Sequence, residues 1–413
     1  MSASCSSRQL TTMASSISNF ETASRSASSS TVAAAGGRCA LHRCETFVGR
    51  TTNWLYDHLR FVPDYESMVL CDELAHREEF PLLEARRVQR DSLARRVWRR
   101  VAGARPFPSD ARWLRRARPS VLHSHFGDVA VEDFALRAYL GVPWIVSFYG
   151  ADAYQSEPVP GWREKYDRLF VDATLVLALG PRMAARLEAA GCPREKLVVH
   201  HLGVDVDGLP TRPRVLDRGE TLRILFAGTF REKKGVEYVI RGAAAARACG
   251  VPIEVTLVGD AGGKQGDVET KKAIYREIER LSLGDVVTHR PYVPFGGLVE
   301  LALSSHVFVA PSVTAADGDA EGTPFVLQQM MATGMPVIAT THSDIPFLFG
   351  QDADRLVPER DADAIARRLV EYADDPTQLV VDGTAMRNRV QTALDVRDRA
   401  TQLSRIYDQV LSA

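Results

Sequence analysis

The sequence has no long apolar run, no close cysteine pairs and almost no net charge. No stretch of its 413 residues approaches the about 20 apolar residues that a membrane-spanning helix needs. None of the six cysteines has C-x-x-C spacing, and scattered cysteines in so long a chain fit a reducing cytosol better than a disulfide scaffold. A net charge of −1 argues against a generally basic nucleic-acid binder.

Residues 1–37 contain much Ser, Ala and Thr and almost no acidic residues. The segment lacks the continuous apolar core of a secretory signal. Because Arg8 and Arg25 lie among serines, a transit peptide is an alternative interpretation of the segment. A disordered leader, or a start site placed too far upstream, explains the composition better.

Beyond the leader, short apolar runs alternate with helical stretches, a pattern typical of βαβ units and parallel sheets. In the first half we expect helices at 129–140 and 181–190 and strands at 121–125, 144–148, 174–179 and 197–200. A polar linker at 211–219 follows. In the second half we expect helices at 236–249 and 271–283 and strands at 223–227, 253–258, 306–310 and 337–339.

This pattern predicts an α/β protein with two Rossmann-like domains. We expect the leader at 1–37, an N-terminal Rossmann-like domain at 38–210 and a C-terminal one at 211–390. A last helix, at 391–413, could pack back on the N-terminal domain.

The strongest chemical signal begins at Glu321. Glu321 and Gly322 precede Thr323 and Pro324, which are typical of a helix N-cap and of proline at the first helical position. The glycine lets a ligand approach the backbone, and a helix N-terminus favours phosphate or hydroxyl partners. We expect the helix to end at Gly334. The preceding Asp-Gly-Asp at 317–319 is typical of an exposed turn.

A second segment, GTFREKKG at 228–235, joins a predicted strand to a predicted helix. Gly228 lets backbone N–H groups face an anion, and the helix dipole adds partial positive charge. Arg231 and Lys234 could neutralise phosphates. A solvated basic turn is the commoner fate of a lone Lys-Lys pair and is the alternative.

Together the two segments resemble the retaining family 4 glycosyltransferases, whose GT-B architecture has two Rossmann-like domains facing each other across a cleft. The resemblance covers roughly residues 44–413. It implies that Glu321 contacts hydroxyls of the sugar of a nucleotide-sugar donor. The backbone groups that would assist it belong to Gly322, Thr323, Pro324 and Phe325.

The resemblance also assigns the basic loop. Lys234 matches the lysine that closes the family's loop, so Lys234, with Gly228 and Arg231, is expected to stabilise the departing diphosphate. Many relatives have Arg directly after the glycine, where this chain has Thr229, and Arg231 could substitute for it. The family's second Glu is replaced by Gln329, whose amide can bond a ribose hydroxyl without charge.

In the first half, polar residues stand at the ends of two predicted strands, where open α/β sheets place ligands. We place His125, Tyr149 and Asp152 in the cleft. Relatives often have a histidine near the donor sugar where this chain has Tyr149, a poor proton shuttle near neutral pH. His123 and His125 face one side of a strand, but no third ligand with suitable spacing accompanies them, so no metal is predicted.

Twelve arginines crowd between Arg86 and Arg118, with Trp98 and Trp113 among them. Such a segment can bind anionic lipid head groups, and a solvated helical face explains it equally well. No nucleic-acid-binding motif accompanies it.

We therefore predict an enzyme that moves a sugar from a nucleotide-sugar to a lipid-linked or polysaccharide acceptor with retention and without a cofactor. We expect it in the cytoplasm, where the basic segment could hold it on the inner face of the membrane. One alternative is a catalytically degenerate relative that only binds nucleotide-sugar, motivated by Gln329 and Tyr149. An unrelated dinucleotide enzyme is disfavoured, because no G-x-G-x-x-G follows any predicted strand.

Overall fold

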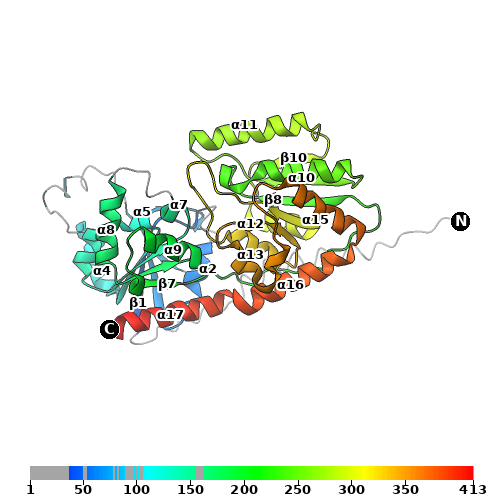
Figure 1. Ribbon diagram of the computed structural model, residues 1–413. Helices are drawn as coiled ribbons and strands as arrows, with labels where there is room; N and C mark the ends of the chain where they lie inside the picture. The colour runs from blue at the N-terminus through cyan, green and yellow to red at the C-terminus, as the bar shows by residue number, and fades with distance from the viewer. Residues whose placement is uncertain are drawn as a thin grey trace. The chain divides into compact units, whose positions relative to one another are not determined.

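The computed structural model describes residues 37–49, 54–77, 80, 83–88, 97–98, 101, 106–154 and 161–412. Apart from Gly37, the predicted leader lies outside these residues. So do six arginines of the basic segment, namely Arg90, Arg95, Arg96, Arg99, Arg100 and Arg105. The described chain forms two parallel α/β sheets, of seven and five strands, which confirms the predicted fold class (Figure 1).

The seven-stranded sheet comes from the first half of the chain and has the order β3-β2-β1-β4-β5-β6-β7. Its strands are β1 (Arg38–Phe47), β2 (Tyr65–Leu74), β3 (Glu84–Arg87), β4 (Val121–His125), β5 (Trp144–Phe148), β6 (Leu175–Ala178) and β7 (Leu197–Val199). The strand order reverses between β1 and β4. Open α/β sheets bind ligands at the carboxyl ends of the strands at such a switch point.

The helices of the first half are α2 (Trp54–Arg60), α4 (Pro108–Ala117), α5 (Gly127–Ala130), α6 (Phe134–Leu140), α7 (Ala151–Tyr154), α8 (Trp162–Asp172), α9 (Pro181–Ala189) and the 3-10 turn η2 (Arg194–Lys196). The single helix predicted at 129–140 is wrong, because the chain breaks between α5 and α6. The buried Asp133 lies at the break. Its carboxylate accepts a hydrogen bond from Ser124 Oγ at 2.8 Å and forms an ion pair with Arg43 Nε at 3.2 Å.

The five-stranded sheet has the order β10-β9-β8-β11-β12, with its switch point between β8 and β11. Its strands are β8 (Leu222–Ala227), β9 (Ile253–Val258), β10 (Val287–Arg290), β11 (Val307–Ala310) and β12 (Val337–Ala339). The accompanying helices are η3 (Glu232–Lys234), α10 (Val236–Ala248), α11 (Gln265–Arg280), α12 (Phe295–Ser304), α13 (Phe325–Ala332), α14 (Ile345–Phe349), η4 (Gly350–Arg355), α15 (Ala362–Asp374) and α16 (Thr377–Ala393).

Apolar side chains on both faces of this sheet explain why its strands read as continuous apolar runs. Along β8, Leu222, Ile224 and Phe226 pack with α10, α11 and α15, while Leu225 and Ala227 pack with α12, α13, α14 and α16. Successive side chains of a strand point to opposite faces, so each strand serves two cores.

The last helix, α17 (Val396–Ser412), packs against the seven-stranded sheet (Figure 1). Leu403 and Tyr407 lie in one apolar cluster with Ala40 of β1 and Ile145 of β5. None of the helices among the described residues combines the length and apolarity that crossing a bilayer requires.

Candidate functional site

Two glycines hold the loop after β8 close to its neighbours at the switch point. Gly235 has a φ of 62°, and a Cβ on it would lie 1.9 Å from the carbonyl oxygen of Pro311, the residue that follows β11. Gly259, after β9, has a φ of 129°, and a Cβ there would lie 2.0 Å from the Gly228 oxygen. Only glycine tolerates both conditions, so the 228–235 loop is fixed beside the segment that leads to Glu321.

The helix α13 begins one residue later than predicted. Its N-cap is Pro324 and no side chain caps it, so the prediction that Thr323 caps the helix is wrong. In the part of the chain that the structure describes, Thr323 Oγ1 is instead buried without a hydrogen-bond partner. The helix ends as expected: its C-cap is Thr333, and Gly334 follows with a φ of 72°.

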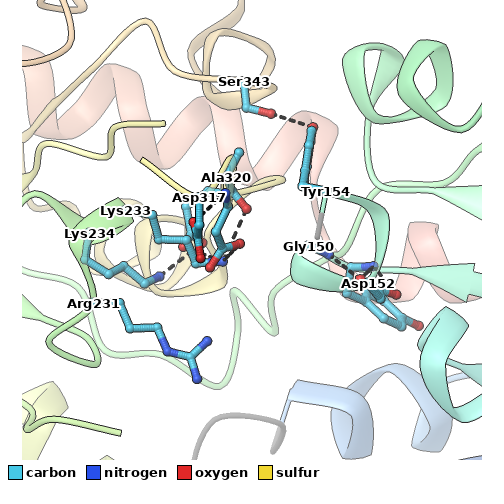
Figure 2. Close-up of polar contacts among 12 residues, drawn as sticks. Gly150, Asp152, Tyr154, Arg231, Lys233, Lys234, Asp317, Ala320 and Ser343 are labelled. Carbon is cyan, nitrogen blue, oxygen red and sulfur yellow. Dashed lines mark hydrogen bonds and ion pairs between the residues drawn. The ribbon is translucent and has the colours of Figure 1, made fainter. Parts of the chain in front are cut away.

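Two lysines of the basic loop converge on Glu321. Lys234 Nζ lies 3.0 Å from Oε2, and Lys233 Nζ lies 3.4 Å from Oε1. Lys233 also contacts Asp319 Oδ1 at 2.9 Å and the Ala320 carbonyl oxygen at 3.2 Å. Figure 2 shows the amine of Lys234 directed toward this cluster, while the guanidinium of Arg231 lies apart from it. Asp319 is buried, so the prediction of an exposed turn at 317–319 is wrong at that residue.

The two lysines keep Glu321 ionised. Burial alone would raise the pKa of its carboxyl, but Lys233 and then Lys234 outweigh burial, and the pKa falls to about 2. Burial would lower the pKa of Lys233, yet Glu321 and Asp319 raise it above its usual value. Both groups are therefore charged at neutral pH.

The backbone of Glu321 is anchored separately from its side chain. Its N–H donates to His342 Nε2 at 2.9 Å, and His342 Nδ1 lies 2.6 Å from Glu359 Oε1. Because Nε2 accepts a hydrogen bond, Nδ1 must carry the ring proton, and it donates a hydrogen bond to Glu359. This chain of bonds fixes where the acidic segment enters the site.

Arg231 is held by an acid that the sequence did not indicate. Its Nε lies 3.5 Å from Oδ2 of Asp267, which stands in the first turn of α11. The contact is an ion pair, and both atoms are buried without a hydrogen-bond partner among the described residues. The guanidinium side chain is one-third exposed.

Several buried polar atoms at this place lack a hydrogen-bond partner among the described residues. They are Glu321 Oε1, Thr323 Oγ1, Arg231 Nε and Asp267 Oδ2. Leaving such a group unsatisfied costs about 1–3 kcal/mol, so a concentration of them calls for a ligand or water. Gln329, the residue predicted to bind ribose, is 9% exposed in the second turn of α13.

Asp152, predicted in the cleft, organises two turns of the first half. Its carboxylate accepts hydrogen bonds from the backbone N–H groups of Gly127, Tyr149 and Gly150 at 3.0, 3.1 and 2.8 Å. Burial raises its pKa to about 6, against these three bonds. The geometry gives it a positioning role.

The Tyr149 side chain points into the first domain. Its hydroxyl lies 2.6 Å from His125 Nδ1, and His125 Nε2 lies 3.1 Å from His42 Nδ1. Burial raises the pKa of Tyr149 and lowers that of His125 well below its usual value. The Tyr149 backbone, in contrast, faces the second domain, since a Cβ on Gly322 would lie 3.3 Å from its carbonyl oxygen.

The histidines form a cluster that the sequence did not reveal in full. Ring nitrogens of His42, His123 and His125 lie within 4.8 Å of one another, close enough to hold a metal ion. His123 is also bonded to Tyr407 of α17 and to Ser147, both at 2.7 Å. Among the described residues no carboxylate belongs to the group, and these hydrogen bonds account for most of its nitrogens.

The described part of the basic segment is divided between β3 and α4. Arg86, in β3, donates to Asp110 at 2.9 Å. Trp113 donates to Glu84 at 2.6 Å and packs on the core of the first domain. Arg112, Arg115 and Arg116 of α4 remain exposed or nearly so.

Each half of the chain matches a family of glycosyltransferases. Residues 63–207 match the family described as Glycosyltransferase Family 4, and residues 221–375 match Glycosyl transferases group 1. WcaL of Salmonella typhimurium, named for colanic acid biosynthesis, is 32% identical over 286 residues, 68% of each chain. The chain belongs to the family 4 glycosyltransferases.

Other relatives of this family 4 chain are similar over somewhat less of their length. WcaL of Escherichia coli is 34% identical over 260 residues, which are 62% of each chain. The amylovoran biosynthesis glycosyltransferase AmsK of Erwinia amylovora is 30% identical over 267 residues, 64% of each chain. The matched part thus spans less than two thirds of these two proteins.

Solved structures show the same GT-B fold. Anabaena HepE in complex with UDP-glucose has a TM-score of 0.72 at 15% identity, over 90% of this chain and 99% of that one. Sucrose-phosphate synthase from Thermosynechococcus elongatus has a TM-score of 0.71 at 17% identity, over 91% and 99%.

Proposed function

We propose that this family 4 protein is a retaining glycosyltransferase that transfers a sugar from a nucleotide-sugar donor. The observation that carries the proposal is the meeting of Glu321 with Lys234 at the switch point of the second sheet. Ligands of open α/β sheets bind at this position. HepE, of the same fold, is described in complex with UDP-glucose.

The buried atoms that lack a hydrogen-bond partner among the described residues support a polyhydroxylated, anionic ligand. Glu321 Oε1 can accept from a sugar hydroxyl, and Thr323 Oγ1 can donate or accept. Arg231 and Lys234 both belong to the loop after β8, and both are partly exposed. A donor placed with its sugar near Glu321 would present its diphosphate to these cations.

Catalysis would then depend mainly on electrostatics. As the bond between the anomeric carbon and the diphosphate oxygen breaks, negative charge grows on the diphosphate and positive charge on the sugar ring. Lys234 and Arg231 would stabilise the former, while the ionised Glu321 holds the sugar hydroxyls. The acceptor hydroxyl attacks the anomeric carbon from the same face, and its proton passes to the departing phosphate oxygen.

The experiment that tests this function uses a panel of nucleotide-sugars. A bound donor raises the melting temperature by mass action, so thermal shift should single out one donor. That donor is then incubated with the protein and simple acceptors, and NMR of the product should show the donor's anomeric configuration. Failure of every donor to shift the melting temperature or to be consumed would contradict the proposal.

The acceptor proposed is lipid-linked or a polysaccharide. The relatives named for colanic acid and amylovoran biosynthesis support this class. A peripheral position on the cytoplasmic face of the membrane would bring the enzyme to a lipid-linked acceptor. The exposed arginines of α4 would favour anionic lipid there.

A second candidate is a protein that binds nucleotide-sugar without turning it over. Gln329 in place of the family's second Glu, and Tyr149 in place of its usual histidine, favour it. A donor-hydrolysis assay separates the two, because a degenerate protein should shift in melting temperature with donor yet release no nucleotide.

A further inference from the structure

Lys233 and Lys234 are neighbours in sequence but differ in their surroundings. The Lys234 side chain is 20% exposed, and its carboxylate partner among the described residues is Glu321. The Lys233 side chain is 8% exposed and lies between Asp319 and Glu321. Successive residues of a 3-10 turn such as η3 project about 120° apart, which lets the two lysines approach Glu321 at different oxygens.

The four charged groups form an alternating, neutral set. Asp319 is paired with Lys233, Lys233 with Glu321, and Glu321 with Lys234. On the donor function proposed above, a diphosphate would compete with Glu321 for Lys234. If Lys234 were the sole partner of Glu321, that competition would leave a buried carboxylate unpaired, which is costly.

We propose that Lys233 is a positioning residue that balances the charge of Glu321 and thereby releases Lys234 to bind the donor diphosphate. Asp319 completes the arrangement, because it keeps the buried Lys233 paired on its other side at 2.9 Å. The proposal rests on the proposed donor site and adds to it a lysine that would touch no phosphate itself.

The test measures diphosphate affinity and needs neither the sugar nor the acceptor. UDP, GDP, ADP and dTDP are titrated into the wild-type protein by calorimetry, and the tightest is carried forward. Lys233→Met is expected to weaken its binding on the order of tenfold, since Glu321 then retains Lys234. Lys233→Arg, which keeps the charge, should bind nearly as well as wild type.

The decisive variant is the double substitution Lys233→Met with Glu321→Gln. Removing the carboxylate charge leaves nothing to retain Lys234, so diphosphate affinity should return to near the wild-type value. Loss of structure around Lys233 would not be rescued in this way. Glu321→Gln alone should bind diphosphate at least as tightly as wild type, because the substitution removes the carboxylate that competes for Lys234.

The outcomes separate this inference from the proposed function. If none of the four diphosphates binds wild type, the donor site fails and the inference fails with it. If wild type binds but Lys233→Met binds equally well, or the double variant stays weak, only the role of Lys233 is refuted. If Lys233→Met does not fold, the double variant Lys233→Met with Asp319→Asn is used, because it removes the charges of Lys233 and Asp319 together. Its diphosphate affinity is then measured with and without Glu321→Gln.

Discussion

Replacing Lys234 with alanine should reduce turnover far more than it reduces stability. The Lys234 amine lies 3.0 Å from Glu321, so its removal breaks one ion pair. Glu321 keeps a partner, however, because Lys233 stays 3.4 Å from its other oxygen. We therefore expect a loss of about 1.5–2 kcal/mol in the free energy of unfolding, the lower end of the range for one bond to a charged group.

The expected effect on the rate is larger. Lys234 would meet the diphosphate where negative charge develops, and removing one such electrostatic donor costs on the order of 10²–10³ in rate, or about 3–4 kcal/mol in the barrier. Donor binding should weaken less than this, because the charge on the diphosphate is greatest as it departs.

The assay is steady-state release of nucleoside diphosphate from the donor that gives the largest thermal shift. Donor affinity by calorimetry and melting temperature are measured beside it. Lys272→Ala is a matched control, since Lys272 lies on the surface of α11, 61% exposed and paired with Glu269 at 2.9 Å. Unchanged turnover in a folded Lys234→Ala protein would remove this lysine from the mechanism.

Three further substitutions test other parts of the site. Glu321→Gln should abolish transfer in a folded protein; a variant that melts early yet keeps its specific activity would reduce Glu321 to a structural carboxylate. The pKa of Glu321 is lowered to about 2, so its ionised side chain stabilises the fold fully above about pH 4.5, and this contribution is lost as the pH falls toward 2. The free energy of unfolding should therefore fall less steeply below pH 4.5 in Glu321→Gln than in wild type. Gln329→Glu should tighten donor binding by about 1–2 kcal/mol in calorimetry, and weaker binding would indicate a pocket built around an amide. Changing Arg112, Arg115 and Arg116 to Gln should weaken binding to anionic vesicles, measured by sedimentation, by roughly 1 kcal/mol per residue. Salt-independent binding of the wild type would instead argue that these arginines only form a solvated face.

The periodicity of the sequence predicted much of the fold. The strands β4, β5, β9 and β12 begin and end at the predicted residues, because Gly or Pro lies close to their ends and limits each strand. The strands β1, β2, β3 and β10 were not predicted. Histidine, arginine and cysteine interrupt the apolar residues of β1, and only tertiary partners such as Asp133 and Tyr407 make such side chains tolerable there.

The sequence predicted those residues of the candidate site that belong to short, recognisable segments. Glu321 and Lys234 could be picked out from short segments beside glycines. Asp267 and His342 could not, because they reach Arg231 and Glu321 from elements 36 and 21 residues away along the chain. Their own surroundings in the sequence carry no sign of this partnership.

Lys233 illustrates why spacing alone cannot assign such a site. In the sequence, two adjacent lysines offer the same charge, and the resemblance favoured the one next to Gly235. The structure separates them: Gly235 allows the turn η3 to approach Pro311 closely, and Lys233 lies inward, 2.9 Å from Asp319. A buried lysine needs a paired acid, and Asp319, which the sequence suggested was exposed, is that acid. The burial of Asp319 therefore supports the role proposed for Lys233. Neither the burial nor the role could be predicted before the positions of the two loops were known.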